Sequence, residues 1–180
     1  MEEEKSIKTY SVSLHLDTES TLFITSLIED IAAATGNSYR KDKGIVPHIT
    51  VGMFKALKDR NSFISMCLPF INNLCPFSVE IEKFEILKGK ILYASLSNKD
   101  KFKEIEKGLF DILSNNFRPC SNNLYSPDIF FPHITLATGL SNKQREEALK
   151  VIHNIQLPRK IYINRIVLAI TKPYEIIFEK

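Results

Sequence analysis

The sequence predicts an α+β fold: two lobes related by duplication, whose antiparallel sheets face a central cleft, with the helices outside. The first observation is that the tetrapeptide Pro-His-Ile-Thr occurs twice, at 47–50 and at 132–135. The second is that a strand, helix, strand, helix, strand pattern surrounds each copy. The third is a nearly constant offset, since the motif histidines are 85 positions apart and the Ser-Leu pairs at 13–14 and 95–96 are 82 apart. A duplicated unit implies a pseudo-twofold axis, with helices packed on the outer faces of the sheets.

The first lobe is predicted over about residues 7–88. Alternating apolar residues indicate its strands, and apolar stripes with helical spacing indicate its helices. Asp17 or Thr18 caps the first helix and Gly36 ends it, while Pro69 is expected to kink or shorten the second helix. The predicted elements are a strand over 10–16, a helix to 36, a polar loop over 38–44, the motif strand to 54, a helix from 59 to 70 and a strand over 77–87.

The second lobe is predicted over about residues 91–171 and repeats this order. Its last helix begins with a capping box formed by Ser141 and Gln144. The predicted elements are a strand over 91–97, a helix to 113, a polar loop over 115–128, the motif strand over 129–136, a helix to 153 and a strand over 160–171. Pro173 breaks this strand, and a final strand over 174–179 completes a single domain of 180 residues.

Each motif places an imidazole beside a hydroxyl. Residues two apart in a strand point to the same face. His48 and Thr50 therefore share one face while Ile49 turns into the core, and His133 and Thr135 repeat this arrangement. The duplication predicts that the two His-Thr couples lie opposite one another across the cleft.

Two facing imidazoles suit the transfer of a phosphoryl group. With an ordinary pKa near ~6.5, one imidazole can take a proton from the attacking oxygen while the other donates one to the leaving oxygen. The hydroxyls can donate to the non-bridging oxygens, where negative charge collects. A 2',3'-cyclic phosphate fits this chemistry, because its ribose leaving group requires an acid. No metal or other cofactor is predicted, because neither motif has an Asp, Glu or Cys at ligand spacing.

The doubled His-x-Thr motif in a duplicated α/β chain of this length resembles the 2H phosphoesterase superfamily. Within it, the chain is similar to the bacterial 2'-5' RNA ligase and cyclic phosphodiesterase-like proteins. The resemblance implies that His48 and His133 are the acid/base pair, that Thr50 and Thr135 bind the phosphate, and that the fold is bilobal and metal-free. Many ligase-like members have a basic residue just past the second motif strand, where this chain has Thr138. This difference favours hydrolysis over RNA ligation.

Other side chains are candidates for binding the substrate, a nucleotide or an RNA end. Tyr10 and Tyr39 could stack on a base, and the alternative for each is a rim or core aromatic. Arg40 and its neighbours Lys41 and Lys43 are expected in a solvated loop rather than at a phosphate. The remaining histidines, at 15 and 153, are expected at the surface.

Composition narrows the class of protein. The chain is 44% hydrophobic and 25% charged with a formal net charge of +3, which is typical of a globular protein and permits an anionic ligand. There is no long apolar run and no secretory signal, so we expect a cytoplasmic protein without membrane contact. We also expect a monomer. The three cysteines are expected to be free or buried thiols. The alternatives to hydrolysis are 2'-5' RNA ligation, a non-catalytic binder of RNA ends or nucleotides, and a structural scaffold.

Overall fold

The computed structural model of the protein describes residues 7–56, 59–120 and 130–180. The mixed helix and strand fold with an antiparallel sheet is confirmed. The first half contains β1 (Lys8–Leu16), α1 (Thr18–Thr35), α2 (Tyr39–Asp42), β2 (His48–Ala56), α3 (Arg60–Asn73) and β3 (Phe77–Leu87). The second contains β4 (Ile91–Leu96), α4 (Lys99–Leu113), β5 (Arg118–Pro119), β6 (His133–Ala137), α5 (Asn142–His153), β7 (Arg159–Thr171) and β8 (Tyr174–Glu179).

The local signals read from the sequence explain most helix ends. The Asp17 side chain accepts a hydrogen bond from the backbone of Ser20, and Gly36 ends α1 with a positive φ of 69°. The capping box at the start of α5 is present as predicted. Other local predictions are wrong: α2 forms inside the first predicted polar loop, β5 forms inside the second, and Pro69 does not shorten α3, which continues to Asn73. Residues 121–128 of the second predicted loop lie outside the described residues.

The prediction that the strands form two separate sheets is wrong. All strands of the described residues belong to one antiparallel sheet in the order β5-β2-β1-β7-β3-β4-β6, with β8 paired to β7. The last strands of the two halves are exchanged, because β7 pairs with β1 while β3 pairs with β4, and β3 and β7 pair with each other in the middle. The pseudo-twofold relation of the halves is thus kept within a single sheet.

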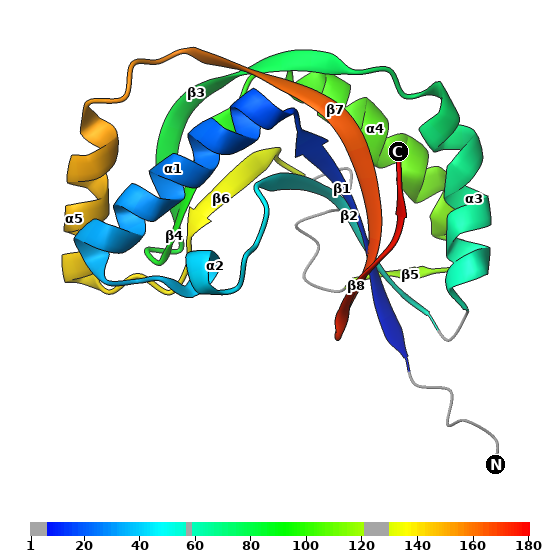
Figure 1. The fold of residues 1–180 in the computed structure, drawn as a ribbon. Helices are drawn as coiled ribbons and strands as arrows, with labels where there is room; N and C mark the ends of the chain where they lie inside the picture. Colours follow the sequence, from blue (N-terminus) through cyan, green and yellow to red (C-terminus); the bar gives the residue numbers. More distant parts are fainter. Residues whose placement is uncertain (1–6, 57–58, 121–129) are drawn as a thin grey trace.

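The helices follow the same exchanged pattern. The sheet forms an arch, with α1 and α5 at one leg and α3 and α4 at the other (Figure 1), and each pair contains one helix from each half. The helix α1 also contacts β6, and α4 contacts β2. The two motif strands, which lie near opposite ends of the strand order, contact each other. No helix of the described residues is long and apolar enough to span a membrane.

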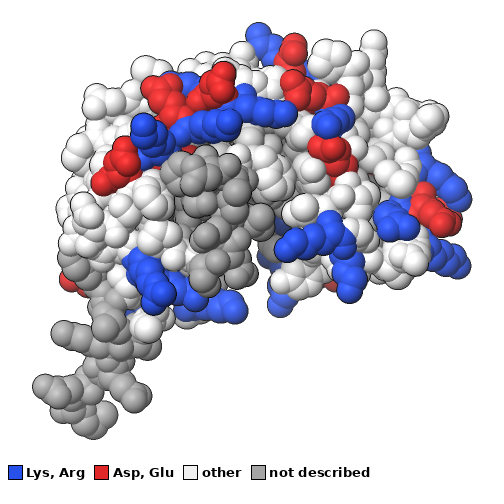
Figure 2. All heavy atoms as spheres, turned by 180° about the vertical axis from the view of Figure 1, so that it is seen from behind, with Lys and Arg blue, Asp and Glu red and all other residues white. Residues whose placement is uncertain are grey.

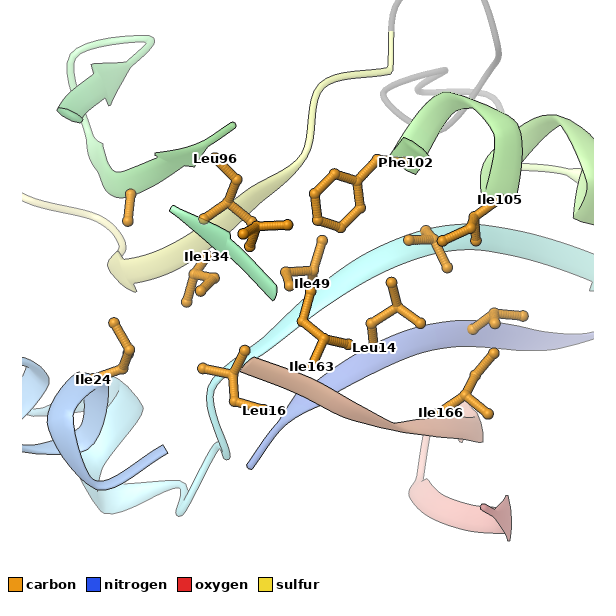
Figure 3. Packing of buried hydrophobic residues seen from close by; sticks show 14 of the residues in the cluster. Leu14, Leu16, Ile24, Ile49, Leu96, Phe102, Ile105, Ile134, Ile163 and Ile166 are labelled. Atoms are coloured by element: carbon orange, nitrogen blue, oxygen red, sulfur yellow. The ribbon is translucent and has the colours of Figure 1, made fainter. Parts of the chain in front are cut away.

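One core holds both motif strands in place. Ile49 of β2 and Ile134 of β6 are fully buried and lie in the same cluster as Ile24 of α1 and Phe102 of α4 (Figure 3). Burial of such a side chain stabilises the fold by about 1.5–3 kcal/mol. Because residues in a strand alternate, this burial fixes the direction of the histidine and threonine on either side of each isoleucine.

Candidate functional site

Both motif histidines are held in the same way at the start of their strands. The Nδ1 atom of His48 lies 2.8 Å from the carbonyl oxygen of Val46, and that of His133 lies 3.1 Å from the carbonyl oxygen of Phe131. A carbonyl oxygen only accepts, so Nδ1–H is the donor in each ring. This fixes the tautomer and leaves Nε2 of each imidazole as the nitrogen that can exchange a proton with a ligand.

An identical irregularity follows each motif. Against β1, Val51 is an extra residue between Thr50 and Gly52, and against β4, Leu136 is an extra residue directly after Thr135. These are β-bulges, which bend a strand and redirect its side chains, and which are over-represented beside active sites. The two His-Thr couples are therefore alike in backbone geometry as well as in sequence.

The surroundings of both imidazoles lower their pKa values and so favour the neutral form. Burial lowers the pKa of His48 and of His133, and the hydrogen bond to the backbone carbonyl opposes this in each case. The positive charge of Arg40 lowers both pKa values further, and His133 also lowers that of His48. One guanidinium therefore acts on both histidines, and one motif histidine also acts on the other.

A pocket of about 520 Å³ adjoins the first motif. His48 and Thr50 line it together with His15, Tyr39 and Tyr174. The second motif does not line this pocket and is instead flanked by aromatic rings, with the Phe131 ring centroid 4.7 Å and the Tyr93 ring centroid 5.5 Å from that of His133. The two sides of the site thus share the His-Thr couple and differ in what surrounds it.

His15 is part of this site, and the prediction that it lies at the surface is wrong. It pairs with His48 across β1 and β2, with the ring centroids 5.7 Å apart, and it is only 6% exposed. Its pKa falls to about 4 because of burial and the nearby charges of His48 and Arg165. The alternation in β1 correctly put His15 on the face opposite the core, but the sequence carries no signal that His15 lies between His48 of β2 and Arg165 of β7.

The two tyrosines predicted to bind a base lie in different places, one in the core and one at the pocket. Tyr10 has no exposed surface, and its ring packs 4.6 Å from Phe63 and 5.6 Å from Phe117, so the prediction that it stacks on a substrate is wrong. Tyr39 is 54% exposed and lines the pocket beside His48. Tyr174, which the sequence reasoning missed, lines the same pocket and is 65% exposed.

The prediction that Arg40 lies in a solvated loop is also wrong. The expected solvated loop is the helix α2, and within it Arg40 is 9% exposed while Lys41 is exposed. Among the described residues, its Nε has no hydrogen-bond partner. Nothing in the local pattern distinguishes Arg40 from the lysines beside it.

Charged side chains gather unevenly over the surface. Figure 2 shows the lower edge of one face hollowed between groups of Lys and Arg side chains, with most acidic side chains higher up.

Within the described ranges, no group of three or more His, Cys, Asp or Glu side chains could hold a metal ion. The cysteines are free, as predicted, and burial raises the pKa of Cys67 to about 12.

Solved structures share this fold at low sequence identity. Escherichia coli LigT in complex with 3'-AMP is 11% identical, with a TM-score of 0.59 over 97% of this chain and 98% of that chain. TT0787 of Thermus thermophilus is 10% identical, with a TM-score of 0.58 over 95% and 96% of the two chains. A protein described as a phosphoesterase is 10% identical, with a TM-score of 0.57 over 96% and 97%. No curated protein sequence matches the chain.

A match to a protein-family model shows the family of this chain. The model described as the 2'-5' RNA ligase superfamily matches residues 25–174, which include both motifs. This confirms the resemblance drawn from the doubled His-x-Thr motif. The chain belongs to the 2'-5' RNA ligase superfamily.

Proposed function

We propose that the protein is a metal-independent phosphodiesterase that hydrolyses a 2',3'-cyclic phosphate or a 2'-5' linkage at an RNA end or in a nucleotide. His48 and His133 are the acid/base pair, and Thr50 and Thr135 donate hydrogen bonds to the phosphate. The observation that supports this most strongly is the matched geometry of the two couples. Each motif histidine donates from Nδ1 to the carbonyl two residues earlier, and the strands that carry them contact each other.

The proposed reaction uses one neutral and one protonated imidazole. Water attacks the phosphorus of a cyclic phosphate and gives a proton to Nε2 of the neutral imidazole. The bond from phosphorus to one ribose oxygen breaks, and the other imidazole donates its Nε2 proton to that oxygen. The product is a phosphate monoester with a free ribose hydroxyl, and the two histidines end with exchanged protonation states.

The pocket beside His48 is suited to the nucleoside part of the substrate. Tyr39 and Tyr174 are exposed rings on its wall, and base–aromatic stacking contributes about 1–3 kcal/mol per base. The LigT structure contains 3'-AMP, which supports a nucleotide as the ligand class here. The monomeric state and the cytoplasmic location inferred from the sequence stay predictions.

A turnover assay in the presence of EDTA tests this function. We expect 2',3'-cyclic nucleotides or short RNAs with cyclic phosphate ends to be hydrolysed at the same rate with and without the chelator. Loss of activity in EDTA would contradict the metal-independent mechanism. Binding of these esters without turnover of any of them would identify a non-catalytic binder instead, and joining of RNA ends would identify a ligase.

A further inference from the structure

We propose that Arg40 binds the phosphate of the substrate, the same phosphate on which the two histidines act. This inference rests on the proposed function. The residue reaches the site from α2, outside both motifs. The helix α2 leads through a short loop into β2 and contacts β6, so it is connected to one motif strand and packed against the other (Figure 1).

The burial of Arg40 is costly without a ligand. It is the only buried Arg or Lys among the residues described, and its Nε donor is unpaired there. Buried charges in proteins are normally paired, because removing an unpaired cation from water is strongly unfavourable. An anion between the motif strands would satisfy the guanidinium, which matches two phosphate oxygens with its planar pair of donors.

The rest of the site needs such a cation. The threonine hydroxyls are neutral, and both motif imidazoles are biased toward the neutral form by their lowered pKa values. A phosphodiester carries a negative charge that grows on its non-bridging oxygens as the reaction proceeds. Arg40, whose charge acts on both imidazoles, is placed to compensate it.

Two substitutions separate the charge from the geometry of the side chain. Arg40→Met removes the guanidinium and keeps an unbranched apolar stem, and Arg40→Lys keeps the charge without the planar pair of donors. We expect Arg40→Met to weaken the binding of 3'-AMP and of inorganic phosphate about 10- to 100-fold, with a smaller loss for Arg40→Lys. The matched control is Lys41→Met, which removes an exposed cation from the same helix and should leave binding unchanged.

Two further measurements separate ligand binding from a structural role. In Arg40→Met the pKa of both motif histidines should rise, because a nearby positive charge is gone, and the kcat/KM profile should move to higher pH. The midpoint of chemical unfolding should stay the same or increase, because a buried cation whose Nε has no hydrogen-bond partner among the described residues is removed. A lower midpoint in Arg40→Met would indicate a structural residue and overturn the proposal.

The outcomes for Arg40 and for the proposed function are distinguishable. If the wild type hydrolyses cyclic nucleotides and Arg40→Met binds 3'-AMP and phosphate as tightly as the wild type, only the inference about Arg40 fails. If the wild type binds 3'-AMP without hydrolysing any ester, and Arg40→Met loses that binding, the inference holds and the hydrolase proposal fails. If the wild type neither binds 3'-AMP or phosphate nor hydrolyses an ester, both fail.

Discussion

Each motif histidine makes a hydrogen bond to the backbone carbonyl two residues earlier, just before its strand begins. Because Nδ1–H of each ring is used by the carbonyl two residues earlier, only Nε2 can serve as proton donor or acceptor toward a substrate. The same bond fixes the plane of the ring, so less freedom is lost when the substrate binds. In the reaction we propose, this orientation lets one ring accept a proton while the other donates one.

Replacement of either histidine should slow the reaction strongly. We expect His48→Ala and His133→Ala each to lower kcat by about 10²–10⁴-fold, because each removes one proton transfer. The double variant should be little slower than the worse single variant, since the two residues act as a unit. His153→Ala, at an exposed histidine at the end of α5, is the control. Additive losses, or full activity in either single variant, would contradict a paired mechanism.

His15 gives the fold a dependence on pH. Its pKa is about 4 in the folded protein and about 6.5 when unfolded, so between these values the unfolded chain binds more protons. His15 therefore does not lower the free energy of unfolding above pH 6.5, where it is neutral in both states. As the pH falls from 6.5 toward 4, the free energy of unfolding decreases by about 3 kcal/mol in total because of this residue. We expect His15→Gln to lose less stability than the wild type between about pH 7 and pH 4.5 in denaturant titrations. An equal loss in both proteins would contradict this assignment.

At the scale of the element, the bulge in β2 changes which residues face the core. Before the bulge Ile49 and Val51 are buried, whereas after it Phe54 is buried and Met53 faces the pocket. Gly52 lies at the point of change, and a Cβ there would be 2.8 Å from the Phe54 ring. The strand therefore needs a residue without a side chain directly after its motif.

Substitution of Gly52 should test this packing. We expect Gly52→Ala to lower the free energy of unfolding by about 1–3 kcal/mol, because the added methyl overpacks a ring that is only 2% exposed. In a Phe54→Leu background the same substitution should cost less, since the crowded ring is absent. Denaturant unfolding of the four proteins gives the coupling energy. The same cost in both backgrounds would show that the ring is not the reason.

Local sequence patterns predicted the elements of the site better than its full set of residues. Alternation predicted both motif strands and the direction of their histidines, and it also put Tyr10 on the same face as the buried Val12 and Leu14, a signal that predicts its burial. Arg40 could not be predicted, because burial of one cation among exposed ones depends on how α2 packs in the fold, where it contacts both α1 and β6. The contact with β6 is between residues far apart in the sequence and leaves no periodic pattern.

At the scale of the whole molecule, the two halves are joined by their exchanged strands. The repeat predicted related halves, but periodicity within a strand does not say which partner it pairs with, so the single sheet was not predicted. The result is that β1 depends on β7, and β4 on β3, for one of its neighbours. Neither half contains a complete set of strand partners.

The exchange predicts that the halves do not fold separately. A fragment over 1–89 lacks the strand that pairs with both β1 and β3, and a fragment over 90–180 lacks the strand that pairs with both β4 and β7. We expect each fragment alone to give a poorly dispersed NMR spectrum, in contrast to the dispersed spectrum of the full chain. A well-dispersed spectrum from either fragment would show that the halves are independent lobes.

In the proposed function, two imidazoles from the two halves act on one phosphate. An NMR titration with 3'-AMP tests it directly, following the ring signals of His48 and His133, which are assigned with His48→Gln and His133→Gln variants. We expect the signals of both rings to shift together, with one dissociation constant and at a stoichiometry of one nucleotide per chain. Shifts at only one of the two rings, or two different dissociation constants, would contradict a shared phosphate site.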